Sequence, residues 1–407
     1  RVSRFLGIDL DALRRENYYS PKNGIKTPYG QIVKNIKIEK IINEMETFAG
    51  LEKRKLLVER FNTSQINKNQ PYRKGIAFMP AKFGISFNKV SLNQAGALVH
   101  VYTDGSVRLN HGGTEMGQGL FIKVAQVVSE CFNIPIDYVH ISGTNTDEVP
   151  NTSATAASSG SDINGMAAWK AATVIKQRML KHASKVFQKP PSSIEFKNGL
   201  ILSGNKSMTF KELAFSCWEN RISLSSTGFY KTPKISWDQE KFKGSPYFYF
   251  TWGAAVSEAI IDIDTGESRI LRADIIQDCG SSLNPLIDRG QIEGGFIQGI
   301  GWLTCEELYF NPEGKLLTLG PSTYKIPGSR DVPPEFNIKL LENTPNEEKT
   351  IFRSKAVGEP PLLLSISHFL ALKNAVSMAS ETSNADLLNA PATPSKILAA
   401  VHNDHSM

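Results

Sequence analysis

Cysteine is scarce in this chain and widely scattered. Four of the 407 residues are cysteine, namely Cys131, Cys217, Cys279 and Cys305, and no two of them form a CxxC pair. Iron–sulfur clusters and structural zinc sites need closely spaced thiolates, so this spacing excludes both kinds of site. We expect four buried free thiols instead, which are typical of proteins in a reducing cytoplasm.

Long apolar runs are also lacking. No run reaches the roughly 18–20 residues that a membrane helix needs, and no basic-then-apolar secretory leader is present. We therefore expect no membrane segment and a cytoplasmic location. The chain begins with Arg1 rather than methionine, so we expect residues 1–70 to continue from an upstream half.

A concentrated block of positive charge is absent. The 46 basic and 40 acidic residues leave a net charge of +6 that is spread along the chain. Proteins that bind nucleic acids gather Lys and Arg on one stripe or patch, so this pattern favours a solvated surface and no nucleic-acid partner. The apolar share of 41% and the charged share of 21% are ordinary for a globular protein.

Helical and strand patterns alternate along the chain. Apolar periodicity predicts helices over 2–17 and 36–61, whereas residues 75–110 show the alternation of strands around an Asp-Gly turn at 104–105. The same turn signals predict further hairpins at 198–199, 264–266 and 312–314. We expect an α+β fold with mixed or antiparallel sheets. Its parts would be a helical segment (1–70) and a second domain (71–407) with two subdomains, about 71–240 and 241–407.

The later helices have clearer signals. Asn284-Pro285 is an N-cap followed by proline at the first helical position, and the helix it opens carries five glycines between 290 and 301. Glycines at this density predict very close packing against another element. Two more helices are expected over 363–378 and 393–402.

Three separated stretches carry the chemistry that the chain suggests. HGGTEMGQG (111–119) is a glycine-rich turn from strand to helix, where free amides and the helix dipole suit an anion. The segment 144–162 is rich in Ser, Thr, Ala and Asn and directly precedes a helix. From composition alone, the first stretch is equally compatible with a tight structural turn, and the second with a plain surface loop.

The third stretch is Gly358-Glu359-Pro360-Pro361. Proline after Glu359 disfavours helical geometry for that glutamate, so we expect an extended backbone there. A carboxylate held on such a turn beside the apolar run 362–364 suits a general base. The alternative is a surface turn before a helix, in which Glu359 interacts with the helix N-terminus.

Taken together, these stretches resemble the C-terminal half of the molybdenum-binding subunit of xanthine dehydrogenases, in the xanthine oxidase and aldehyde oxidase family of molybdenum hydroxylases. The resemblance runs in order along nearly the whole chain. It includes 82–87 (KFGISF), 92–97 (LNQAGA), 111–119, 151–162, 225–230 (SSTGFY), 280–285 (GSSLNP), 320–325 (GPSTYK) and GEPPL at 358–362.

The resemblance implies a molybdenum–pyranopterin cofactor (Mo-molybdopterin) whose metal carries oxo, sulfido and hydroxyl ligands. Glu359 matches the glutamate that deprotonates the hydroxyl, after which the oxygen attacks the substrate carbon and hydride passes to the sulfido group. The implied activity is the oxidation of hypoxanthine to xanthine and of xanthine to urate. The alternatives are a family member that acts on aldehydes or other N-heterocycles, and a folded, non-catalytic portion that binds no cofactor alone.

The same resemblance assigns roles to individual residues. The implied cofactor contacts are Met116, Gly117, Gln118, Ala157, Ser158, Ser161 and Gln291. Within this set, the main chain of Ala157 would lie beside the metal, and Ser158 and Ser161 would hold the phosphate-bearing end. Phe87 matches one of two phenylalanines that sandwich the flat substrate. Asn88 stands where relatives usually have threonine, so it would either alter a substrate hydrogen bond or merely replace one polar group with another.

The resemblance also implies what this chain needs from elsewhere. No GGGFGGKE-like or AFRGFGGPQ-like loop is present, so the other wall of the pocket and the purine-recognising residues would come from the N-terminal half of the subunit. Electrons would leave through 2Fe-2S clusters and FAD on other domains or subunits. The expected assembly of the complete enzyme is a homodimer.

Overall fold

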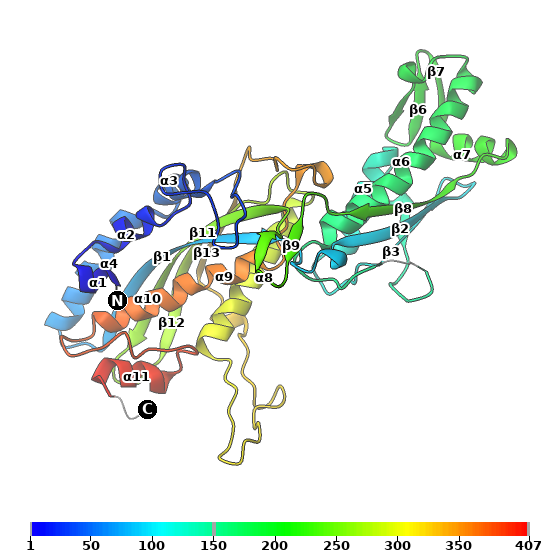
Figure 1. Ribbon diagram of the computed structural model, residues 1–407. Coiled ribbons are helices and arrows are strands. Elements are labelled where there is room, and N and C mark those ends of the chain that lie inside the picture. The colour runs from blue at the N-terminus through cyan, green and yellow to red at the C-terminus, as the bar shows by residue number, and fades with distance from the viewer. Residues whose placement is uncertain (1, 149–151, 405–407) are drawn as a thin grey trace.

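The computed structural model describes residues 2–148 and 152–404 and confirms the α+β class (Figure 1). Pro150 and Asn151, within the second predicted stretch, lie outside the described residues. The helices are α1 (Val2–Leu6), α2 (Leu10–Glu16), α3 (Ile38–Ala49), α4 (Leu51–Asn67), α5 (Leu120–Phe132), α6 (Gly160–Phe187), α7 (Phe210–Glu219), α8 (Pro285–Thr304), α9 (Pro360–Leu364), α10 (Ile366–Ser377) and α11 (Pro394–His402). The strands are β1 (Tyr72–Ile85), β2 (Gln94–Val101), β3 (Val107–His111), β4 (Val139–Ile141), β5 (Glu195–Lys197), β6 (Leu200–Ser203), β7 (Lys206–Thr209), β8 (Ser225–Lys231), β9 (Ser236–Asp238), β10 (Lys243–Ser245), β11 (Tyr249–Asp262), β12 (Ser268–Gln277) and β13 (Glu335–Leu340).

The first large sheet has the strand order β1-β11-β12-β13, and only β13 runs parallel to its neighbour. Helices cover both of its faces (Figure 1). On β11, Trp252 and Val256 pack with α3 and α4, whereas Ala255 packs with α8 on the opposite face. Burial of both faces explains why β11 is almost continuously apolar in sequence.

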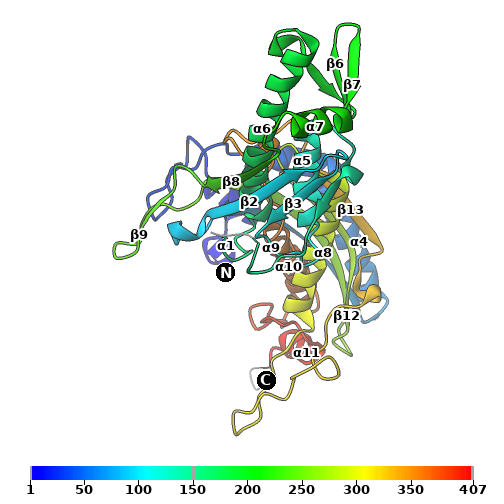
Figure 2. The same cartoon turned by 90° about the vertical axis from the view of Figure 1, so that its right-hand side faces the viewer.

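The second large sheet has the order β4-β3-β2-β8 and carries α5 and α6. Gly228 on β8 lets the α6 backbone lie directly on the strand, because a Cβ there would be 2.0 Å from the Ala167 carbonyl oxygen. A small lobe of β5, β6, β7 and α7 extends from the far end of α6, away from the first sheet (Figure 2). The two large sheets and their helices stand side by side, with the starts of α5 and α6 toward the first sheet (Figure 1).

Most predicted elements form, and the differences have local causes. The hairpins at 104–105, 198–199 and 264–266 are confirmed, but the turn at 312–314 closes only the single bridge between Phe310 and Leu316. The helices predicted over 2–17 and 36–61 are each broken in two, at Gly7 and Gly50, whose φ angles are 65° and 60°. Glycine takes up this left-handed backbone without steric cost, so each break falls at a glycine.

Strand pairing does not follow the subdomain boundary that we predict near residue 240. Residues 72–85 form β1, which pairs along its whole length with β11 at 249–262. The first strand after the helical segment therefore belongs to the same sheet as the C-terminal part of the chain. No helix within 2–148 or 152–404 is both long and apolar enough to cross a bilayer.

Close packing of α8 is confirmed for its C-terminal half. A Cβ on Gly299 would lie 2.1 Å from Ser365 Oγ and 2.6 Å from the Leu362 carbonyl oxygen, so α9 rests directly on the α8 backbone. Gly290 and Gly294, in contrast, have nothing within 4 Å of an added Cβ among the described residues. The contact at Gly299 fixes α9, and with it the glutamate at the start of α9.

Candidate functional site

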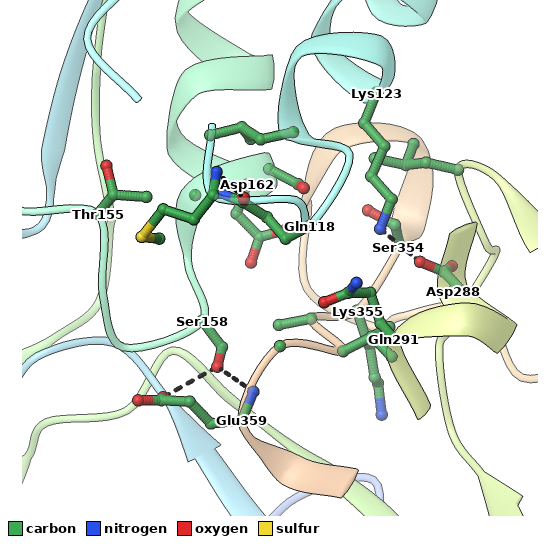
Figure 3. A pocket seen from close by; sticks show the side chains of 18 of the residues that line it. Gln118, Lys123, Thr155, Ser158, Asp162, Asp288, Gln291, Ser354, Lys355 and Glu359 are labelled. Atoms are coloured by element: carbon green, nitrogen blue, oxygen red, sulfur yellow. Dashed lines mark hydrogen bonds and ion pairs between the residues drawn. The ribbon is translucent and has the colours of Figure 1, made fainter. Parts of the chain in front are cut away.

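Four segments that are far apart in sequence line one cavity of about 300 Å³ (Figure 3). They are the loop 116–123 at the start of α5, the loop 155–162 at the start of α6, residues 283–291 around the start of α8, and residues 354–359 before α9. The cavity thus lies where the helices of the second sheet meet α8 and α9 of the first.

The N-terminus of α5 is not free to bind an anion, so of the two alternatives for the HGGTEMGQG loop the structure favours the tight structural turn. The Glu115 carboxylate accepts hydrogen bonds from the N–H groups of Gly117 (2.9 Å), Gly119 (3.0 Å) and Phe121 (2.9 Å). Partial burial favours the neutral acid, but these amides outweigh burial and lower the pKa of Glu115. The loop's own carboxylate therefore occupies the position that a phosphate would need.

The Gln118 side chain closes the same loop. Its Nε2 donates to the Thr114 carbonyl oxygen at 2.7 Å, and its Oε1 accepts from the Met116 N–H at 2.5 Å. Both ends of the amide are thus engaged within the loop. Gln118 lines the cavity in a fixed orientation, and Met116 beside it is exposed.

The N-terminus of α6 is the open one. Its N-cap residue, Ser159, makes no side-chain capping bond, and within the described ranges nothing accepts the N–H groups of the first three helical residues, 160–162. Ala157 and Ser158 just before it have φ angles of 55° and 54°. Such left-handed backbone costs about 1–3 kcal/mol per non-glycine residue and concentrates at functional sites. These free amides and the helix dipole suit an anion.

Glu359 and Ser158 form a reciprocal pair at the cavity edge (Figure 3). Ser158 Oγ donates to Glu359 Oε2 at 2.9 Å and accepts from the Glu359 N–H at 2.8 Å. The backbone of Glu359 is helical (φ −89°, ψ −32°), so our prediction of an extended conformation before Pro360 is wrong. Glu359 is the N-cap of α9, and the two bonds to Ser158 offset the steric cost of helical geometry before proline.

Two buried ion pairs support the floor of the cavity, and of their members Lys123, Asp288 and Lys355 line it. Lys123 Nζ lies 2.5 Å from Asp288 Oδ1, and Ser282 Oγ donates to the other oxygen of that carboxylate. Lys355 Nζ lies 2.5 Å from Asp278 Oδ2. Because each lysine has a carboxylate partner, the floor is polar without carrying an uncompensated charge.

A third buried carboxylate, Asp162, lies in the first turn of α6. Its Oδ2 accepts a hydrogen bond from the Tyr249 hydroxyl at 2.6 Å. Burial raises the pKa of Asp162 to about 7, although the bond from Tyr249 and the charge of Lys123 act in the opposite direction. This carboxyl group therefore titrates near neutrality inside the cavity wall.

The structure brings together most of the residues that the resemblance singles out. Cavity-lining positions are taken by Met116, Gln118, Ser158, Ser161, Gln291 and Glu359. Gly117 and Ala157 belong to the lining loops without themselves lining the cavity. Phe87 and Asn88 lie just beyond β1 and do not line it; their substrate roles stay predictions.

Sequence reasoning missed several polar residues of the wall. Lys123, Asp288 and Lys355 are buried and line the cavity, and Tyr249 bonds Asp162 from behind it. Lys123 carried a usable signal, because a lysine within the apolar face of a helix needs a buried partner. The sequence carried no signal for which residue is the partner, because Lys123 and Asp288 are 165 residues apart.

Known proteins match this chain along most of its length. The family model of the molybdopterin cofactor-binding domain matches residues 45–333. A xanthine dehydrogenase/oxidase of Felis catus is 45% identical over 398 residues, which cover 96% of this chain and 28% of that protein. A xanthine dehydrogenase of Dictyostelium discoideum is 44% identical over 403 residues, covering 98% and 28%. The chain thus spans a little over a quarter of the length of these relatives.

Solved structures share the fold. Quinoline 2-oxidoreductase from Pseudomonas putida 86 superposes with a TM-score of 0.81 at 21% identity, over 98% of this chain and 50% of that one. A reconstituted CO dehydrogenase from Oligotropha carboxidovorans gives 0.82 at 21% identity, over 99% and 50%. Identities this low bear on the fold alone. Because the family model covers most of the chain, including the loops that open α5 and α6, the chain belongs to the molybdopterin cofactor-binding domain family.

Proposed function

We propose that this chain forms one wall of the active site of a molybdenum hydroxylase that oxidises hypoxanthine to xanthine and xanthine to urate. The observation that carries the proposal is the placement of Glu359, bonded by Ser158, in the same cavity as the open N-terminus of α6. Relatives named xanthine dehydrogenase, 44–45% identical along nearly the whole chain, support purines as the substrate class.

The cavity suits a pyranopterin cofactor with an anionic end. The free amides at the start of α6 are donors for a phosphate group, and Ser161 adds a hydroxyl group beside them. Ser158 would hold the same end from the loop before α6, although its own hydroxyl hydrogen is donated to Glu359. Met116, Gly117, Gln118 and Gln291 would hold the pterin part, and the main chain of Ala157 would lie beside the metal. The left-handed backbone at 157–158 supports this placement, because it turns the loop before α6.

The residues of this chain would accept a proton and orient the substrate. When bound, the cofactor supplies the two-electron oxidation that exchanges a ring carbon–hydrogen bond for a carbon–oxygen bond. Glu359 would accept the proton of the attacking oxygen nucleophile as general base. Ser158 holds Oε2, so we assign proton transfer to Oε1, which has no hydrogen-bond partner among the described residues. Phe87 would stack on the flat ring, with Asn88 next to it.

The proposal extends to the partners that the reaction requires. The N-terminal half of the molybdenum-binding subunit would supply the facing wall of the pocket and the purine-recognising residues. Iron–sulfur and FAD domains would carry electrons away, in a homodimeric cytoplasmic enzyme. The length of the relatives, of which this chain matches 28%, supports the presence of such further domains.

Substitution Glu359→Gln in the holoenzyme tests the general base. The amide keeps an acceptor for Ser158 but cannot take a proton at neutral pH, so kcat for xanthine should fall by about 10²- to 10⁴-fold. Molybdenum content should stay unchanged. The control is Glu313→Gln in the exposed turn after α8, which should leave kcat unaltered. Activity retained by Glu359→Gln would refute the assignment, and a higher kcat/KM for an aldehyde than for xanthine would refute the substrate class.

A further inference from the structure

One buried hydroxyl group joins three elements behind the cavity. The Tyr249 hydroxyl, at the start of β11, donates to Asp162 Oδ2 at 2.6 Å and accepts from the Ala356 N–H at 2.8 Å. Asp162 belongs to α6, and Ala356 lies three residues before Glu359. Tyr249 and Asp162 are each only 6% exposed. The hydroxyl therefore links the loop that opens α6 with the turn that carries the glutamate.

The direction of these two bonds is coupled. A tyrosine hydroxyl has a single hydrogen to donate, and the acceptor that binds this hydrogen selects the direction in which the O–H bond points. With the hydrogen held by the Asp162 carboxylate, a lone pair of the oxygen points at the Ala356 N–H. Asp162 thus orients a hydroxyl that in turn fixes a backbone amide.

The hydrogen bond of the Ala356 N–H lies between two other hydrogen-bonded positions of the segment 355–359. On one side, the Lys355 N–H donates to the Cys279 carbonyl oxygen at 2.8 Å, and Lys355 Nζ is paired with Asp278. On the other side, the Glu359 N–H donates to Ser158 Oγ. Between them lie Val357 and Gly358, and a glycine holds no conformation by itself.

Packing alone does not explain why a carboxylate is buried at position 162. A carboxylate in the interior costs several kcal/mol unless its oxygens are compensated, and an apolar residue of similar size is often more stable. Among the described residues, the Tyr249 hydroxyl is the one hydrogen-bond donor to Asp162. The charge of Lys123 also acts on Asp162, but Lys123 is itself paired with Asp288.

We propose that Asp162 and Tyr249 are positioning residues for Glu359. The carboxylate orients the tyrosine hydroxyl, the hydroxyl holds the Ala356 amide, and the amide sets the path of the backbone into Glu359. Neither residue takes part in proton transfer. The inference rests on the proposed role of Glu359 as general base.

The test uses Tyr249→Phe, with Tyr247→Phe as the matched control, because Tyr247 lies two residues earlier and bonds neither Asp162 nor Ala356. Amide hydrogen exchange followed at Ala356 should be at least about tenfold faster in Tyr249→Phe and unchanged in Tyr247→Phe. In the holoenzyme, kcat should fall about 10- to 100-fold for the first variant, with KM and molybdenum content unchanged, because a shift of about 1 Å in a catalytic group costs that much.

A second pair separates orientation from folding. Asp162→Asn keeps an oxygen that accepts the Tyr249 hydroxyl, so kcat should stay within about threefold of wild type, whereas Asp162→Leu should lose as much as Tyr249→Phe. Unchanged exchange at Ala356 in Tyr249→Phe would overturn the inference, as would equal losses in the Asn and Leu variants. Activity retained by Glu359→Gln would instead overturn the proposed function, and the exchange rate at Ala356 would not depend on that result.

Discussion

Single residues decide how the cavity meets a ligand. The GEPP turn pointed to Glu359 from the sequence, and the structure supplies Ser158 as its partner 201 residues away. Tyr249 and Asp162 were not predictable in this role, because the hydrogen bonds that define it span 87 and 107 residues. The local sequence pattern predicts which residue types lie in a loop, but only the folded structure shows which loops come into contact.

At this scale we predict the effect of Ser158→Ala. The change removes the donor to Glu359 Oε2 and the acceptor of the Glu359 N–H. The bond to the carboxylate is the charged one of the two and contributes about 1.5–3 kcal/mol, so its loss should lower kcat about tenfold or more. The control is Ser153→Ala, whose hydroxyl bonds the Gln94 carbonyl oxygen. Equal kcat values in both variants would show that Ser158 does not orient Glu359.

At the scale of secondary-structure elements, the N-termini of α5 and α6 and the packing of α8 shape the cavity. From the sequence, each of the two loops that open α5 and α6 could be an anion site or a purely structural loop, whereas in the structure α5 is capped by Glu115 and α6 is open. The distinction depends on where one side chain folds back, which spacing alone does not specify. The glycines of α8 likewise predicted close packing without showing which of them are in contact.

Capping of α5 gives a stability prediction. Glu115→Ala removes three amide contacts and the favourable charge at the helix start, so the free energy of unfolding should fall by about 1–2 kcal/mol. Because the pKa of Glu115 is lowered by folding, this contribution is present above its unfolded pKa and is lost as the pH falls through the folded value. Glu130→Ala near the other end of α5 should have little effect. Urea unfolding at pH 7 would contradict the cap if both variants behaved alike.

The α8 glycines provide a matched pair. Gly299→Ala puts a methyl group 2.6 Å from the Leu362 carbonyl oxygen, so overpacking should cost about 1–3 kcal/mol. Gly294→Ala meets nothing within 4 Å among the described residues and should stabilise the helix by up to about 1 kcal/mol. Urea unfolding of both variants measures the difference. A Gly299→Ala chain as stable as wild type would mean that α9 does not rest on α8 in this way.

The whole molecule places two sheets and their helices side by side and forms its cavity from segments of both. The α+β class and most hairpins followed from apolar alternation and turn residues. The pairing of β1 with β11 did not, because about 165 residues separate the two strands and nothing local in either one specifies the partner. The site could therefore be assembled from sequence only through the family resemblance.

Acid should destabilise the whole fold through two histidines. Burial lowers the pKa of His111 and of His368 to about 4 each, below the ordinary value of 6.5. The unfolded chain then binds more protons between pH 6.5 and 4, so stability is lost as the pH falls through that window, by about 2–3 kcal/mol per histidine. Asp162, with its pKa raised to about 7, changes stability in the opposite direction over the same window. Because it is one group against two histidines, the net effect of lowering the pH is still a loss of stability.

Thermal unfolding between pH 7 and 4.5 measures this effect. His368→Gln removes one titrating group and should reduce the drop in Tm between the two ends of the range. The exposed His402 provides the control, since His402→Gln should leave the slope of Tm against pH unchanged. A slope unaltered by His368→Gln would show that this histidine is not held neutral.

The central claim is that the start of α6 receives the anionic end of a molybdenum cofactor, and molybdenum content measures it most directly. Ser161→Asp and Ser161→Asn have nearly the same shape, and an acidic residue in the first turn favours the helix itself. The added negative charge, however, would repel a phosphate group. In protein purified from cells that make the cofactor, we predict that molybdenum per chain falls about tenfold or more in the Asp variant and stays within about twofold of wild type in the Asn variant. Equal, undiminished molybdenum in both variants would contradict the account.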